Sequence, residues 1–186
     1  MDKDVSAGSG ITTVAGRLAL GITLLAFGLG HTAVIDGVSA ADAVSIAQYV
    51  GGIALFVAGL MALRGGDSAG GTAFSVLGAL WFTWAVSAGV SGNEAGFFLL
   101  LFALVVLSLT LAGGEQLGQV VHGLFFVALL LMAIAEFAGN DGFTKVGGWF
   151  AVAAGAVAWY AATAALAHWP TALPRRAAGR GVTATG

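Results

Sequence analysis

Residues 95–112, AGFFLLLFALVVLSLTLA, form an uninterrupted apolar run without a charged side chain. A helix rises ~1.5 Å per residue, so a run of this length crosses most of the ~30 Å hydrocarbon core of a bilayer. Strands that cross a membrane alternate apolar and polar residues, and this run does not alternate. The stretch therefore predicts a transmembrane helix.

Stretches of the same kind recur before and after this one. They are residues 18–35, 44–63, 72–90, 117–138 and 146–168, and none has Lys or Arg in its middle. The segments between them are short and turn-like. The sequence therefore predicts an all-α fold, a six-helix transmembrane bundle over residues 18–168. We expect residues 1–17 to form a cytoplasmic N-terminal segment and residues 169–186 to form a disordered cytoplasmic tail.

The composition supports a lipid environment. Only 9% of the residues are charged and 59% are apolar, whereas a soluble domain carries ~25% charged residues. We therefore expect the lipid bilayer as the main partner and a multi-pass location in the plasma membrane. Nucleic acid is excluded as a partner, because the chain has only 7 Lys and Arg residues and no basic stripe.

The positive charges predict the orientation, because in short loops they collect on the cytoplasmic side. In the six-helix arrangement only Lys145 falls on the other side, together with Asp36, Asp42, Glu94 and Asp141. An even number of crossings with N-in/C-in topology accounts for this distribution. The residues that then lie on the cytoplasmic side are Lys3, Arg17, Arg64, Arg175, Arg176 and Arg180.

Two ionisable side chains are candidates for carrying a proton. Glu136 is the one carboxylate that falls inside a predicted span, and ionisable groups within a membrane are functional hypotheses by default. The alternative is that Glu136 reaches the nearby interface beside Asn140 and has no functional role. His31 falls at the same end of the bundle, where it is either the partner of Glu136 or an interface residue.

No cofactor, metal or enzymatic activity is expected. His31 falls at the outer end of the bundle, while His122 and His168 fall at the inner end, so a site with three histidines is ruled out. A haem bound by His122 and His168 has nothing beyond their shared leaflet in its favour. The chain has 0 Cys and carries no phosphate loop, zinc-binding histidine pair or nucleophile elbow.

Most of the chain resembles a known family, most clearly at the second and third spans. The residues that carry the resemblance run from Gly51-Gly52-Ile53-Ala54 through Ala58-Gly59-Leu60 and Gly70-Gly71-Thr72-Ala73-Phe74 to Gly78 and Trp81. They resemble the signature of the acetate uptake transporter family, whose members are six-span succinate/acetate–proton symporters or channels. A weaker likeness includes Ala138-Gly139-Asn140.

The resemblance implies a substrate, an assembly and a set of site residues. The substrate would be a small monocarboxylic acid, and the assembly a ring-shaped homo-oligomer, commonly a hexamer, with one pathway in each protomer. Alignment with the family places Leu20, Leu77 and Phe125 at the narrowing of that pathway. The motif residues with a pathway or packing role would be Gly51, Gly52, Gly59, Thr72, Phe74, Trp81 and Asn140.

Departures from the family pattern favour a neutral solute. The family's polar residues are replaced by Leu55, Ala62 and Leu77, and its proline-rich entry motif is replaced by residues 11–20. We therefore expect a membrane permease or channel for acetate or a similar small monocarboxylate, moved with a proton or as the neutral acid. The alternatives are a urea-type or ammonia-type channel for neutral solutes and a non-transporting membrane subunit.

Overall fold

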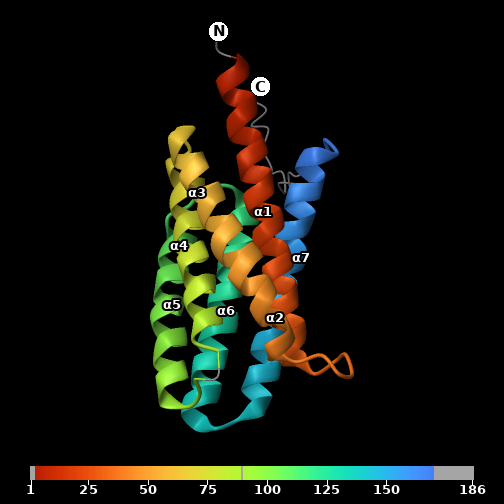
Figure 1. Ribbon diagram of the computed structural model, residues 1–186, viewed down its shortest axis with the longest axis vertical. Helices are drawn as coiled ribbons and strands as arrows, with labels where there is room; N and C mark the ends of the chain where they lie inside the picture. The colour runs from red at the N-terminus through yellow and green to blue at the C-terminus, as the bar shows by residue number, and fades with distance from the viewer. Residues whose placement is uncertain (1–2, 89, 170–186) are drawn as a thin grey trace, which may run out of the picture.

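The computed structural model describes residues 3–88 and 90–169 and is helical throughout its regular elements (Figure 1). The segments α2, η1 and α3 follow one another directly and form one rod, so the chain forms six rods that are long and apolar enough to cross a membrane. The predicted all-α, six-helix transmembrane fold is confirmed. The elements are α1 (Lys3–Thr32), α2 (Ala40–Ile46), the π-helix η1 (Ala47–Ala54), α3 (Leu55–Arg64), α4 (Ser68–Val86), α5 (Asn93–Leu111), α6 (Gln116–Ala138) and α7 (Asp141–Leu166).

The helices begin earlier than the apolar runs that predicted them, and in α4 and α7 a capping side chain, Asp67 or Asn140, sets the start. The Asn140 side chain accepts a hydrogen bond from the Gly142 N–H at 2.9 Å, so α7 begins at Asp141 rather than at residue 146. Helix α1 begins at Lys3, so the described part of the predicted N-terminal segment of residues 1–17 is continuous with the first span. The cytoplasmic placement of this segment stays a prediction, and the predicted tail lies outside the described residues beyond Trp169.

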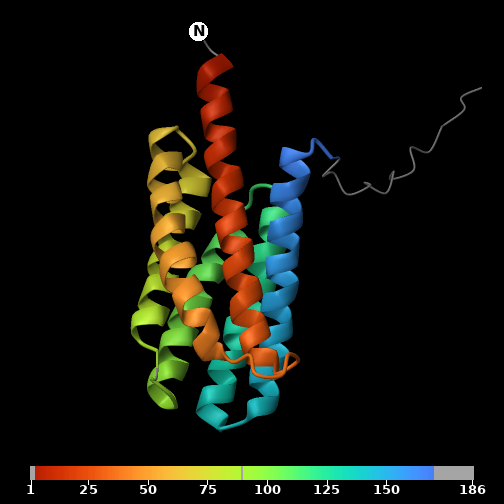
Figure 2. The same ribbon diagram turned by 45° about the vertical axis from the view of Figure 1, so that its right-hand side comes forward.

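The rods form one bundle with α1 extending past the others at its N-terminal end (Figures 1 and 2). Helix α1 packs against α7 on one side and against the α2–η1–α3 rod on the other. The backbones also approach closely between α5 and α6, between α6 and α7, and between α3 and α4. Among the described residues, α4 makes no comparable backbone approach to α5 or α6.

Helices α1 and α7 approach each other through pairs of glycines. A Cβ atom added to Gly28 would lie 2.7 Å from the carbonyl oxygen of Gly148, and one added to Gly148 would lie 3.0 Å from that of Gly28. Gly21 and Gly155 form a second pair of the same kind, with 3.2 Å and 2.9 Å to each other's carbonyl oxygens. Small residues that allow such contact replace the missing hydrophobic drive between helices in lipid.

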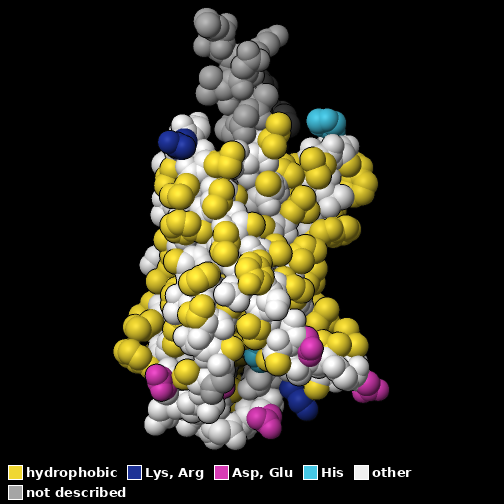
Figure 3. Space-filling model, in the orientation of Figure 1, with side chains coloured by type: hydrophobic (Ala, Val, Ile, Leu, Met, Phe, Trp, Pro, Cys, Tyr) yellow, Lys and Arg dark blue, Asp and Glu magenta, His cyan; other side chains and the backbone are white. Residues whose placement is uncertain are grey.

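The face of the bundle seen in Figure 3 is largely apolar between its two ends. Large side chains such as Phe97, Leu104 and Trp159 are 60%, 53% and 47% exposed, which suits contact with lipid tails. Acidic side chains gather at the end that holds the loops between α1 and α2, α4 and α5, and α6 and α7 (Figure 3). The chain is therefore a multi-pass membrane protein.

Candidate functional site

Two cavities lie at opposite ends of the bundle. One, here called the His31 cavity, has a volume of about 350 Å³ and is lined by Phe27 and His31 of α1 and by residues from α2, α4, α5 and α6. The other, the Arg17 cavity, has a volume of about 560 Å³ and is lined by Thr13 and Arg17 of α1 and by residues from α4 to α7. Both cavities lie where α4 stands apart from α5 and α6.

The three residues that the sequence places at a constriction are buried in the core. Leu20 of α1 is 3% exposed, and Leu77 of α4 and Phe125 of α6 are each 0% exposed. All three belong to one hydrophobic cluster, and Leu20 also lines the inner wall of the Arg17 cavity. The structure thus brings Leu20, Leu77 and Phe125 into one apolar core from three different helices.

A row of aromatic rings connects this core with the His31 cavity. The ring of Phe27, on the cavity wall, meets the ring of Trp81 edge to face, with centroids 5.1 Å apart. Trp81 in turn stacks on Phe125, with centroids 5.4 Å apart and an angle of 14° between the rings. The two cavities are therefore separated by a layer of leucine and aromatic side chains, which we call the barrier: Leu20, Leu24, Leu55, Leu77, Trp81 and Phe125.

His31 and Glu136 line the same cavity. The Nδ1 atom of His31 lies 2.7 Å from the carbonyl oxygen of Phe27. A carbonyl oxygen only accepts, so Nδ1 carries the proton, and Nε2 is the atom that can take up another. Oε2 of Glu136 accepts a hydrogen bond of 2.7 Å from the N–H of Gly92, the N-cap residue just before α5, so this carboxylate also holds the loop between α4 and α5 in place.

The charges that line the cavities are mostly negative. Among the described lining residues, the His31 cavity contains Glu94 and Glu136 and no Lys or Arg. The Arg17 cavity contains one Arg, and its guanidinium forms an ion pair with Glu115. Asp67, on the same wall, accepts hydrogen bonds from the Thr13 hydroxyl at 3.2 Å and from the Gly70 N–H at 2.8 Å.

The glycines of the sequence motif lie at contacts between helices. A Cβ added to Gly51 would lie 2.5 Å from Thr23 of α1 and 3.0 Å from Trp81 of α4, and one added to Gly52 would lie 3.0 Å from the Phe82 side chain. Both residues belong to the π-helix η1. The hydropathy of the sequence carries no signal for that π-helix, although such segments often mark functional positions.

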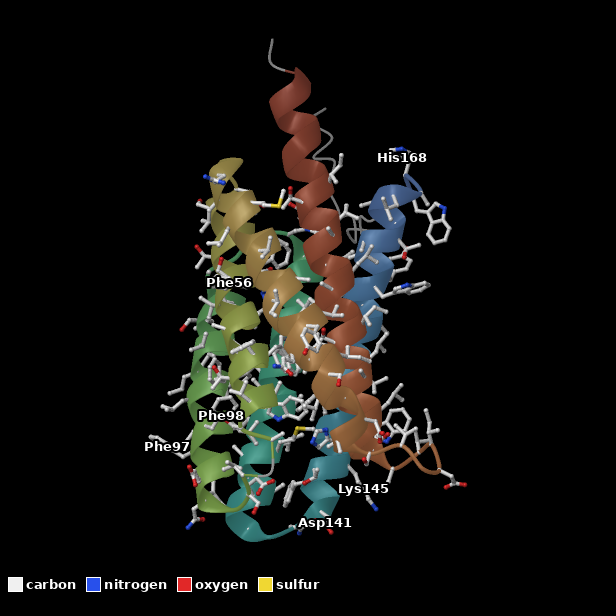
Figure 4. All side chains as sticks on the ribbon, viewed as in Figure 1. Phe56, Phe97, Phe98, Asp141, Lys145 and His168 are labelled. Atoms are coloured by element: carbon white, nitrogen blue, oxygen red, sulfur yellow. The ribbon has the colours of Figure 1, made fainter. Side chains whose placement is uncertain are left out.

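The remaining motif residues fall in three different places. Gly59 of α3 packs on Ser75 of α4, whose backbone nitrogen would lie 2.5 Å from an added Cβ. Thr72 and Phe74 line the Arg17 cavity. Asn140 caps α7 at the end of the bundle opposite to the Arg17 cavity; the neighbouring Asp141 is labelled there in Figure 4.

The histidines are spread along the bundle. His31 lines one cavity and His122 the other. His168 is exposed at the end opposite to Asp141 and Lys145 (Figure 4).

The structure is that of a multi-pass membrane protein with six apolar rods. It has a cavity at each end of the bundle, and a buried apolar layer lies between the two cavities, as in a protein that passes a solute. The sequence profile of the GPR1/FUN34/yaaH family matches residues 10–172, and the chain belongs to this family. The predicted resemblance to the acetate uptake transporters is thereby confirmed.

Named relatives and a solved structure agree with this membership. The succinate-acetate/proton symporter SatP of Escherichia coli K12 is 29% identical over 161 residues, which cover 79% of this chain and 83% of SatP. The ammonia transport outward protein 2 of Saccharomyces cerevisiae is 30% identical over 141 residues, which cover 67% of this chain and 50% of the yeast protein. The chain thus spans about half the length of the yeast relatives that it matches.

The fold is also that of a solved relative. The structure of the bacterial acetate channel SatP superposes with a TM-score of 0.75 at 25% identity, covering 84% of this chain and 92% of that chain.

Proposed function

We propose that this protein is a plasma-membrane permease or channel for acetate or a similarly small monocarboxylic acid, and not an enzyme. The observation that carries the proposal is the pair of cavities that approach one buried apolar barrier from opposite ends of the bundle. The membership in a family that includes a succinate-acetate/proton symporter and an acetate channel supports the choice of solute.

The barrier favours transport of the acid together with its proton. Moving an unpaired carboxylate into an apolar layer carries a large desolvation cost. No Lys or Arg of the described residues belongs to the barrier, and the His31 cavity presents Glu94 and Glu136 to an arriving anion. A neutral acid avoids both penalties, so the solute crosses the barrier protonated or meets a proton in the His31 cavity.

His31 and Glu136 are the groups that we propose for handling this proton. Both line the His31 cavity, and the Nε2 atom of His31 is not engaged by the bond that Nδ1 makes to Phe27. The proposed N-in/C-in topology places this cavity on the outer side and the Arg17 cavity on the cytoplasmic side. Arg17 and Arg64 lie toward the side that this topology makes cytoplasmic, in keeping with the positive-inside rule.

Leu20, Leu77 and Phe125 form the proposed constriction. A narrow apolar layer can pass a small, weakly hydrated solute while it excludes ions by dewetting. Removing the Phe125 ring, which is 0% exposed and stacked on Trp81, opens space between the cavities. The variant Phe125→Ala should therefore conduct faster and admit larger monocarboxylic acids than the wild type.

The test is uptake of labelled acetate into proteoliposomes across an imposed pH gradient. Protein-free vesicles measure the passive leak of acetic acid, and Phe97→Ala is the matched control because Phe97 is 60% exposed on the outer surface. Uptake above the leak in the wild type and in Phe97→Ala, with a wider substrate range in Phe125→Ala, supports the proposal. Uptake equal to the leak in every preparation contradicts transport of the acid and leaves the neutral-solute channel or the non-transporting subunit.

A neutral-solute channel of the ammonia or urea type is the second candidate. The name of the yeast relative, ammonia transport outward protein 2, favours it, and so does a barrier without a charged side chain. The same vesicles distinguish the two, because entering ammonia raises the internal pH and entering acid lowers it.

The resemblance also implies a homo-oligomer, which for this family is commonly a hexamer. Native mass spectrometry of the detergent-purified protein measures the number of copies. A monomer as the only species would contradict this part of the proposal.

A further inference from the structure

The indole N–H of Trp81 has no hydrogen-bond partner in the described part of the chain, although the side chain is only 1% exposed. Buried polar groups are almost always paired, and an unpaired one in a native structure calls for an explanation. In a barrier between two solute cavities, the simplest explanation is a partner that is present only part of the time.

Trp81 stands within the barrier itself. On α4 it follows Leu77 by one helical turn, so the two side chains lie on the same face of the helix. Its ring stacks on Phe125 of α6 and meets Phe27, which lines the His31 cavity. A solute that passes from the His31 cavity to the level of Leu77 and Phe125 must therefore pass the Trp81 ring.

Other polar side chains near this layer are already engaged or lie elsewhere. The hydroxyl of Thr23, which is 1% exposed, donates to the carbonyl oxygen of Ala19 at 2.8 Å. Ser75 also has an unpaired hydroxyl, but it packs against Gly59 at the contact between α3 and α4. Among the described barrier residues, Trp81 is thus the one side chain that offers a free hydrogen-bond donor.

We propose that the indole N–H of Trp81 is a specificity-determining donor that binds an oxygen of the carboxylic acid while the acid crosses the barrier. The inference rests on the proposed function and deepens it. An indole N–H only donates, so it suits the carbonyl oxygen of an acid and favours it over solutes that have no acceptor. Stacking of the ring on Phe125 holds this donor in place.

The test compares Trp81→Phe with Trp159→Phe in the acetate uptake assay. Both variants replace an indole by a phenyl ring, but Trp159 is 47% exposed on the outer surface of α7. We expect uptake to fall about tenfold in Trp81→Phe, the factor for one hydrogen bond of ~1.4 kcal/mol. Trp159→Phe should transport at the wild-type rate.

A second replacement guards against a folding defect in Trp81→Phe. Benzothienylalanine at position 81 keeps the bicyclic ring and its stacking and replaces only the N–H by sulfur. Provided that the wild-type protein transports acetate, either of two results overturns the inference. One is a wild-type uptake rate with benzothienylalanine at position 81, and the other is equal uptake rates in Trp81→Phe and Trp159→Phe. If the wild type takes up no acetate above the leak, the proposed function fails instead, and the inference fails with it.

Discussion

The close contact between α1 and α7 predicts that one added methyl group destabilises the fold. In Gly28→Ala the new Cβ would lie 2.7 Å from the carbonyl oxygen of Gly148 and 2.7 Å from the backbone nitrogen of Val152. Both neighbours are backbone atoms of α7, so neither can turn away as a flexible side chain could. The helices must therefore move apart along this contact.

The size of the effect follows from these distances. Carbon atoms in contact rest ~3.5 Å or more from their neighbours, so the helices must separate by about 0.8 Å. A gap of that size forfeits roughly a quarter to a half of the dispersion energy of the atoms that face it. Overpacking of this kind lowers the free energy of unfolding by about 1–3 kcal/mol. For a chain of this length each kcal/mol lowers Tm by about 2–4 °C.

Thermal unfolding of the purified protein in detergent measures the change, and Gly123→Ala provides the matched control. A Cβ at Gly123 of α6 would meet only the Thr110 side chain, at 3.7 Å, which is an ordinary contact. Because alanine favours a helix more than glycine does, this control should unfold at or slightly above the wild-type temperature. If Gly28→Ala unfolds at the same temperature as Gly123→Ala, the proposed packing of α1 on α7 is incorrect.

Three further variants test other contacts by the same unfolding measurement. Asn140→Ala removes the cap of α7 and should cost about 0.5–2 kcal/mol, whereas Asn140→Ser should restore most of it. Glu136→Leu leaves the Gly92 N–H without its acceptor and should cost about 1–3 kcal/mol, whereas Glu136→Gln keeps an acceptor oxygen and should cost less. Arg17→Gln breaks a partly exposed ion pair with Glu115 and should change stability by less than about 1 kcal/mol. If the two variants at position 140, or the two at position 136, lose equal stability, the contact proposed for that residue is refuted. A loss of stability well above ~1 kcal/mol in Arg17→Gln would refute the account of the ion pair.

The number of spans could be read from the sequence, because hydropathy reports length and solvent directly. The ends of the helices could not, since capping by Asn140 and Asp67 depends on local hydrogen bonds rather than on hydropathy. The inward face of α7 was also missed. Hydropathy does not separate a face in lipid from a face in the core when both are apolar. The size of the side chains does separate them: Gly148, Ala151 and Gly155 face inward, while Trp149 faces outward.

The candidate site was predicted in part. Alignment with the family selected Leu20, Leu77 and Phe125, and the structure brings these residues into one buried cluster; their role as a constriction stays a proposal. The resemblance implied a pathway or packing role for Trp81, and its position one turn after Leu77 agrees with a place in the barrier; its role as a hydrogen-bond donor was not foreseen. Its unpaired N–H depends on contacts between α1, α4 and α6, which no single stretch of sequence contains.

The most direct test of the central claim asks whether the acid crosses with its proton. Proteoliposomes that contain a pH-sensitive dye receive acetate while a potassium gradient with valinomycin sets the membrane potential. The account predicts that the protein accelerates acidification of the lumen beyond the protein-free leak, at a rate that does not change with the sign of the potential. Acetate uptake that follows the potential without acidifying the lumen would show transport of the anion and would contradict the account.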